Sequence, residues 1–517
     1  MSAGVLTRRP VRGATALRGG RVWRPTPYQV FGFLFWLLMT LAYWAVPLCC
    51  DAGLHAAAVE RLQADLLRPR HPTADLPGAG SPAYSPYAVA QGVFARLTGL
   101  AGWETVRLAG PLNLLVVLTG LNRFVRMLSP RPWAPVWALV AMTLLWGTER
   151  ASWSGSLGLM PMTGNLADPS AFAIGLAFWA WALTGTRALD TARVRFVGPR
   201  GLPSLTGCAG LGLLYGLIVL VHPVLSVAAL AGGAATVAGR QRGRGPAVAG
   251  RWALTGAVAL LTAAGWPYFD AFAPAGDSGD PRLYRNLLGH FWLALAAGLP
   301  ALWLRCRRTG PRDPLVLMFA LECLVVAYGR LSGRYLYGGV LGLTLMPLQC
   351  ALAIELAAPR PWPVWRRLLG AGAAVAACAG FLTVHAGAVV PRSLDPVGFD
   401  QPPRRPSYDW AARHVRPGEV VLTDGHHALL SLAGHGANLV APARPDPALD
   451  ERVRRRGLAD VRAYLADQST RAVRTAVVRR HRVRWLLLAP RHTVPEEAVV
   501  VAWSERTGEV LARVAGR

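Results

Sequence analysis

The chain has 517 residues, of which 53% are hydrophobic, and its mean hydropathy is positive. Only 16% of the residues are charged, against about 25% in soluble domains. Apolar stretches of about 16 to 23 residues recur, each long enough to cross a bilayer, so a soluble globular protein is excluded. The net charge is +27, with 55 basic residues that are all Arg. The placement of these Arg explains the charge better than nucleic-acid binding does.

Residues 1–27 hold six Arg and precede an apolar run of about 22 residues that leads into Cys49. A removable signal peptide would have a shorter apolar region and a small-residue cleavage site, so we predict an uncleaved first span. Eleven spans are expected, and 11–13 are compatible with the pattern. A short apolar piece, 86–100, is either a further span or a helix in the membrane interface. The eleven spans lie near residues 28–50, 106–121, 133–147, 169–186, 203–221, 223–239, 252–268, 287–304, 314–328, 337–357 and 368–391.

The segments between the spans alternate in charge. One set holds 24 Arg and only two acidic residues, whereas the other set, up to residue 391, holds 9 Arg and 10 acidic residues. Basic residues accumulate in cytoplasmic loops, so the Arg-rich set is assigned to the cytoplasm. We therefore predict a multi-pass plasma-membrane protein whose N-terminus is cytoplasmic and whose C-terminal part is extracytoplasmic. The Arg-rich segments are residues 1–27, 122–132, 187–202, 239–251, 305–313 and 358–367.

The predicted fold class is a polytopic α-helical membrane protein with a small extracytoplasmic α/β C-terminal domain. Its parts are a basic cytoplasmic N-terminus (1–27), a multi-span membrane domain (28–391) with an external loop (51–105), and the α/β domain (392–517). In the last part we expect strands at 419–424 and 484–490, amphipathic helices at 448–467 and 470–483, and a hairpin at 499–514. The external loop should begin with a helix that lies along the interface, one face among lipid headgroups. That face carries Leu54, Ala58, Leu62 and Leu66.

Asp51 follows the first span directly, and His55 comes one helical turn later on the same predicted helix face. An ionised carboxylate at the end of a span, next to water, can act as a general base or bind a cation. For Asp51 the alternative is a helix cap at the interface, and for His55 a polar interface residue.

Three further titratable residues lie at the outer ends of spans and are candidates for substrate contact. Asp168 precedes Pro169, so a helix cap is its alternative role. Glu149 ends a span and could pair with the adjacent Arg150. His222 stands beside a proline between two apolar runs, where a tight turn explains the proline but not a titratable ring.

A third group of candidates is Arg330, Arg334 and Tyr335, which are predicted to lie outside, against the overall charge trend. Two guanidinium groups beside tyrosines suit an anionic headgroup, because Arg can bind phosphate through two hydrogen bonds. Ordinary interfacial Arg residues are the alternative. Glu322, in the preceding span, is expected to pair with a neighbour inside the bundle.

Other chemistries find little support in the sequence. The histidine-containing segment TDGHHALLSLAGHG lacks the spacing of zinc sites, and Asp424 in it is interpreted as a helix cap. All seven Cys lie in or beside apolar spans, which favours a packing role. P-loop, GxSxG and Rossmann motifs do not occur, so nucleotide hydrolysis is not expected as an energy source. Metal ligands stay unassigned, and a divalent cation stays open as a cofactor.

In chain order, four features resemble the C-type (GT-C) integral-membrane glycosyltransferases, which include protein mannosyltransferases, aminoarabinose transferases and arabinofuranosyltransferases. A basic N-terminus and first span end at an acidic residue, Asp51. The segment 81–128 is similar to the region where that superfamily carries a Pro-rich stretch, a short helix ending in Gly, and an Arg before an apolar span. The segment GRYLYGGVLGLTLMPLQCALAIEL (333–356) is similar to its late Arg-Tyr span. A small extracytoplasmic α/β tail completes the resemblance.

The resemblance implies transfer of a sugar from a polyprenyl-phosphate donor to a hydroxyl on a glycan, lipid or peptide acceptor at the outer face. Mannose is the first sugar expected and arabinose the second. Asp51 would act as general base on the acceptor, with membrane lipids and no nucleic acid as further partners. The alternatives are a transporter or flippase of a lipid-linked sugar, disfavoured by the lack of an internal repeat, and a surface-polysaccharide polymerase or ligase, disfavoured by the lack of a large late loop.

Overall fold

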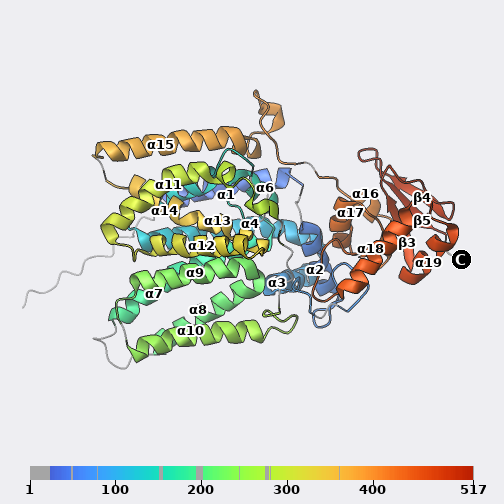
Figure 1. Ribbon diagram of the computed structural model, residues 1–517, viewed down its shortest axis with the longest axis horizontal. Coiled ribbons are helices and arrows are strands. Elements are labelled where there is room, and N and C mark those ends of the chain that lie inside the picture. The colour runs from blue at the N-terminus through green and yellow to red at the C-terminus, as the bar shows by residue number, and fades with distance from the viewer. Residues whose placement is uncertain are drawn as a thin grey trace, which may run out of the picture.

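The computed structural model describes residues 24–47, 51–77, 80–150, 155–193, 202–243, 245–273, 279, 281–359, 361–403 and 405–515. Most of the predicted basic N-terminus, and Cys49 and Cys50, lie outside the described residues. Long helices run side by side in one bundle, and the C-terminal α/β unit lies beyond one end of this bundle (Figure 1). We call this end of the bundle the tail end and the opposite end the far end.

Each of the eleven predicted spans coincides with a helix. Among the described residues, nine helices are long and apolar enough to cross a membrane, and two shorter apolar helices, Ala134–Leu144 and Leu205–Val221, match the other two predictions. Proline in the first turn, where no backbone N–H is needed, starts many of these helices. The helices of the bundle are α1 (Pro27–Ala45), α4 (Gly102–Leu128), α5 (Ala134–Leu144), α6 (Leu159–Asn165), α7 (Pro169–Arg193), α8 (Leu202–Val221), α9 (Pro223–Arg240), α10 (Pro246–Ala264), α11 (Leu287–Thr309), α12 (Pro314–Leu331), α13 (Leu341–Thr344), α14 (Met346–Leu356) and α15 (Val364–Gly380). Short helices η2 (Pro281–Tyr284), η3 (Tyr335–Val340), η4 (Phe381–His385), η5 (Ala386–Ala388) and η6 (Arg392–Leu394) accompany them.

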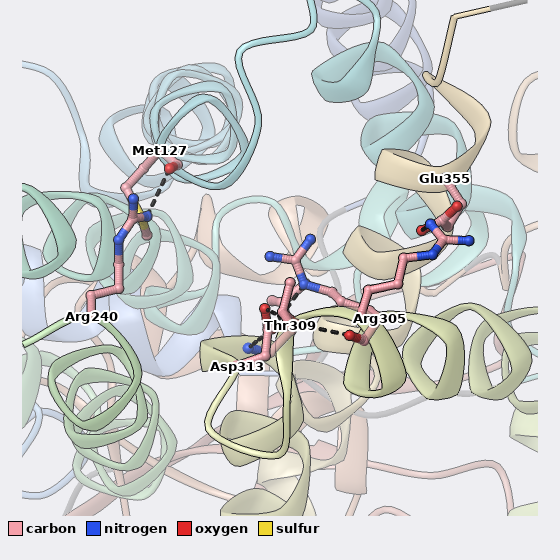
Figure 2. Close-up of polar contacts among 8 residues, drawn as sticks. Met127, Arg240, Arg305, Thr309, Asp313 and Glu355 are labelled. Atoms are coloured by element: carbon pink, nitrogen blue, oxygen red, sulfur yellow. Dashed lines mark hydrogen bonds and ion pairs between the residues drawn. The ribbon is translucent and has the colours of Figure 1, made fainter.

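At the far end, arginine side chains tie the helix ends to one another (Figure 2). Arg240 Nη1 donates to the Met127 carbonyl at the end of α4 over 2.7 Å. Arg305 Nε lies 2.8 Å from Asp313 Oδ1, at the turn from α11 to α12. Cations near helix C-termini also oppose the negative end of the helix dipole. Arg240 and Arg305, which belong to two of the predicted Arg-rich segments, therefore both lie at the far end of the bundle.

The C-terminal unit is a five-stranded sheet in the order β2-β1-β3-β5-β4, with helices beside it (Figure 1). β1 is parallel to β2 and β3, whereas β5 is antiparallel to β3 and β4. Both predicted strands, both predicted helices and the hairpin are present. The two-residue strand β2 carries too short a pattern to be seen in the sequence. The elements are α16 (Asp409–Ala412), β1 (Val420–Leu422), α17 (His426–Ser431), η7 (Leu432–His435), β2 (Asn438–Leu439), α18 (Glu451–Leu465), α19 (Arg471–His481), β3 (Val483–Leu488), β4 (Ala498–Trp503) and β5 (Val510–Val514).

Two short helices, α2 (Ala52–Ala64) and α3 (Pro86–Thr98), lie between the bundle and the α/β unit (Figure 1). α3 has 13 residues and is too short to span a bilayer. The expectation that one face of α2 lies among lipid headgroups is wrong. On that face Ala58 and Leu62 are fully buried, in a cluster with Tyr84. The α/β unit also closes on this helix, since a side chain at Gly53 would collide with the Leu430 carbonyl.

Glu322 corrects a second expectation. Its side chain is fully buried in α12. Neither carboxyl oxygen has a hydrogen-bond partner among the residues that the structure describes. The predicted pairing inside the bundle is therefore wrong, because the buried carboxyl lacks the partner that an ionised group needs at this depth.

Candidate functional site

Asp51 stands at the start of α2, six residues after α1 ends at Ala45. Its backbone carbonyl accepts hydrogen bonds from the N–H groups of Leu54 (2.8 Å) and His55 (3.0 Å). Its side chain makes no capping hydrogen bond, although the residue holds the cap position. Capping therefore does not account for the carboxylate at this position.

The carboxylate of Asp51 is paired on one side only. Oδ2 lies 2.6 Å from Nη1 of Arg444, which belongs to the α/β unit. Oδ1 is buried and has no hydrogen-bond partner among the described residues. Burial raises the pKa of Asp51 above its ordinary value, and the Arg444 guanidinium opposes this shift. A carboxylate with a raised pKa is a stronger proton acceptor than one on the surface.

Asp168, at the start of α7, has two partners. Oδ1 accepts a hydrogen bond from the Ser170 N–H over 2.8 Å, which confirms the capping interpretation. Oδ2 lies 3.8 Å from Nε2 of His55. Burial acts to raise the pKa of Asp168, but His55, Ser170 and His222 outweigh it and hold the pKa well below its ordinary value. Asp168 is therefore ionised at neutral pH.

His222 caps the next helix of this group. Its Nδ1 accepts from the Leu225 N–H over 3.3 Å at the start of α9. Burial lowers the pKa of the ring, while the charge of Asp168 acts in the opposite sense. An accepting nitrogen must be unprotonated, so both observations favour a neutral ring. The cap explains why a histidine stands at position 222, which the tight turn predicted from the sequence did not explain.

The site therefore combines two carboxylates with opposed pKa shifts. Such a separation commonly divides roles between a proton-transferring group and one that stays charged. Asp51 has the raised pKa and an unpartnered oxygen, which suit a general base. Asp168 holds His55 in place beside it. The arrangement can accept a proton just beyond the end of the first apolar helix.

The other candidates from the sequence lie elsewhere. Glu149 hydrogen-bonds Asn286 before α11, and the alternative ion pair with Arg150 is not found among the described residues. Tyr335 begins η3 and packs edge to face on Tyr284. In the part of the chain that the structure describes, no contact joins Glu149, Arg330, Arg334 or Tyr335 to Asp51, His55 or Asp168. Their substrate contacts stay predictions.

Two arginines of this site were missed in the sequence. Arg444 pairs with Asp51, and Arg405 is close enough for the Asp51 charge to oppose the lowering of its pKa by burial. Both stand in proline-containing stretches of the C-terminal part, among many other Arg residues. No local pattern distinguishes them, because their positions depend on how the α/β unit docks.

The residues present do not favour a metal ion. Among the described residues, no group of three or more His, Cys, Asp and Glu side chains is placed to hold one. The oxygens of Asp168 and Oδ2 of Asp51 already have partners.

In the α/β unit, Asp424 pairs with Arg491 and with His492 (3.1 Å) and does not cap a helix, contrary to the sequence interpretation.

The sequence matches no protein-family model, and no curated protein sequence matches it. Solved structures are nevertheless similar. Arabinofuranosyltransferase AftD from Mycobacteria has a TM-score of 0.56 and 16% identity, over 95% of this chain and 40% of that chain. ArnT from Cupriavidus metallidurans has a TM-score of 0.54 and 14% identity, over 94% of this chain and 98% of that chain. Archaeal oligosaccharyltransferase AglB from Archaeoglobus fulgidus, solved with an inhibitory peptide and a dolichol-phosphate, has a TM-score of 0.52 and 10% identity, over 90% of this chain and 69% of that chain.

These likenesses confirm the predicted GT-C membrane fold. The chain spans 40% of the length of AftD and almost all of ArnT. At identities of 10% to 16%, likeness shows the fold, and function has to be argued from the site.

Proposed function

We propose that this protein is a membrane glycosyltransferase that moves a sugar from a polyprenyl-phosphate donor to an acceptor hydroxyl. The observation that supports it best is Asp51, a partly buried carboxylate just past the end of an apolar helix, with one buried oxygen that has no partner among the described residues. The fold neighbours support the same class, since their printed names include an arabinofuranosyltransferase and an oligosaccharyltransferase bound to dolichol-phosphate.

The chemistry follows from where a lipid-linked donor must lie. Its tail stays in the bilayer, so its sugar sits at the interface, at the depth of Asp51. The acceptor oxygen attacks the anomeric carbon, and Asp51 takes the hydroxyl proton. The bond from that carbon to the phosphate oxygen breaks, and the phosphate leaves with the bonding electrons. A nearby guanidinium stabilises the charge that develops on it.

We further propose that the tail end faces the outside of the cell and the far end the cytoplasm. The described arginines at the far end include Arg240, Arg305 and Arg308 from two Arg-rich segments, which favours a cytoplasmic position for this end. Mannose is the first sugar to test and arabinose the second. The acceptor is a hydroxyl of a glycan, a lipid or a peptide.

The test is transfer by purified protein in lipid nanodiscs, with a panel of polyprenyl-phosphate sugars and candidate acceptors. Release of polyprenyl phosphate with one sugar, dependent on Asp51, supports the proposal. If the wild-type protein releases no polyprenyl phosphate from any donor yet moves a lipid-linked sugar between leaflets, the transporter alternative is correct.

A further inference from the structure

The loop between β2 and α18, residues 440–450, joins the α/β unit to the segment after the first span. Asp446 accepts a hydrogen bond from Ser81 Oγ over 2.7 Å, and its Oδ2 lies 3.4 Å from Nε2 of His71. Just before the loop, the Leu439 N–H donates to the Thr73 carbonyl over 2.8 Å. The backbone of this loop is therefore held against the segment that follows α2.

Arg444 stands two residues before this anchor. The loop reads VAPARPDPALD, and prolines on both sides of Arg444 restrict its backbone. Its side chain is 59% exposed, whereas that of Asp51 is 19% exposed. A fixed backbone with an exposed, flexible side chain allows the guanidinium to change partners without moving the loop.

The ion pair between Arg444 and Asp51 conflicts with the role of Asp51 as a base. A guanidinium favours the ionised form of a carboxylate and so weakens its ability to take a proton. Exposed ion pairs also hold together weakly. The donor phosphate is a better partner for the guanidinium than the Asp51 carboxylate is. Arg can form two parallel, charge-assisted hydrogen bonds to the phosphate oxygens.

We propose that Arg444 is a substrate-binding residue that exchanges between two anions. It pairs with Asp51 when the site holds no donor, and it transfers to the phosphate of the lipid-linked donor when one binds. This inference rests on the proposed function and assigns the phosphate contact to the α/β unit. The exchange frees Asp51 to accept a proton only when a donor is present.

The position of Arg444 favours it as the phosphate-binding residue over Arg330 and Arg334, the candidates from the sequence. The base must lie near the attacking hydroxyl, and the leaving phosphate is joined to the carbon under attack. A cation in contact with Asp51 is therefore within reach of that phosphate after a side-chain rotation. Among the described residues, Arg330 and Arg334 make no contact with Asp51.

The test is equilibrium binding of polyprenyl phosphate without a sugar to the full-length protein in nanodiscs. Arg444→Ala should weaken binding by about 10-fold or more, because a charged hydrogen-bonded contact is lost. Arg444→Lys should recover only part of it. Asp51→Asn should bind more tightly than the wild type, because Arg444 no longer has a competing anion. Opposite effects at the two ends of one ion pair would not come from a purely structural role.

Arg456→Ala serves as the matched control, since it removes one exposed charge from the same unit. Unchanged binding by Arg444→Ala, or by Asp51→Asn, would overturn the exchange. A loss in Arg334→Ala without one in Arg444→Ala would do the same. Equal affinity of the wild type for inorganic phosphate would exclude a lipid source. If the wild type transfers sugar but these binding results fail, the inference alone is wrong; if the wild type neither binds polyprenyl phosphate nor transfers sugar, the proposed function is wrong.

Discussion

His55 Nε2 lies 3.8 Å from Asp168 Oδ2, so a contact between an imidazole and a carboxylate joins α2 to the start of α7. The same carboxylate caps α7 through the Ser170 N–H. One side chain thus sets the orientation of His55 beside Asp51 and stabilises the end of a long helix. This double role makes Asp168 a test of how the site is held together.

We expect Asp168→Ala to lower the free energy of unfolding by about 1–2 kcal/mol, because it removes a cap. Asp168→Asn should cost less, since Asn caps about as well as Asp. The difference between the wild type and Asp168→Asn reports the charge alone. Thermal unfolding of the purified proteins in one detergent measures both, and equal stability of Asp168→Ala and the wild type would contradict the capping role.

The stability difference between the wild type and Asp168→Asn should depend on pH. The folded-state pKa of Asp168 lies below its ordinary value of 3.8, so ionised Asp168 contributes its full stability above that value. This contribution is lost as the pH falls through the folded-state pKa. The stability advantage over Asp168→Asn should be full near pH 6 and decline below about pH 4. An advantage that grows on acidification would show the opposite sign and exclude this explanation.

Asp51→Asn should insert and fold normally but lose about 10²-fold or more in turnover, as removal of a general base does. Asp270→Asn is the matched control, because Asp270 is an exposed carboxylate whose Oδ1 accepts a hydrogen bond from the Phe272 N–H, away from the site. Its turnover should stay near that of the wild type. Near-normal transfer by well-folded Asp51→Asn would remove Asp51 from the role of base.

The pH dependence of kcat/KM separates Asp51 from His55. Burial raises the pKa of Asp51 above 3.8, and a base works only when deprotonated. Activity should therefore fall with acid at a pH above the ordinary carboxyl range. The alternative outcome is a fall in kcat/KM whose midpoint lies near the ordinary histidine pKa of about 6.5 and which disappears in His55→Gln. In that case His55 is the base.

Glu322 offers a stability prediction away from the site. Its buried carboxyl has no hydrogen-bond partner among the described residues. An unsatisfied buried polar group costs about 1–3 kcal/mol, and an apolar side chain of similar size avoids this cost. Glu322→Met should therefore raise the melting temperature with little change in sugar transfer. A lower melting temperature, or lost transfer, would show that the carboxyl has a function in the bundle.

The orientation in the membrane is tested by fusions. A reporter that is active only outside the cytoplasm should work when attached after Arg517, because Arg240 and Arg305 of two Arg-rich segments lie at the end of the bundle opposite the α/β unit. A reporter active only in the cytoplasm should work in the turn between α9 and α10. Exchange of these two results would invert the proposed topology.

Local properties of the sequence were sufficient for the eleven apolar helices, the charge alternation and most strands of the α/β unit. Each of these signals depends only on residues that are close in sequence: the hydropathy of a span, the Arg density of a short loop, and the two-residue period of a strand. Asp51, His55 and the Asp168 cap were found for the same reason, since each stands directly at a helix end.

Only the tertiary structure decided which of these ends share a site. Helix α3 covers the face of α2 that was expected among lipid headgroups, and the docked α/β unit brings Arg444 to Asp51 from the other end of the chain. Glu149, Arg330 and Arg334 share the outer-end pattern of Asp51, yet no contact among the described residues links them to it. Hydropathy places a residue along the membrane normal, but its position within the plane depends on long-range packing that no local pattern encodes.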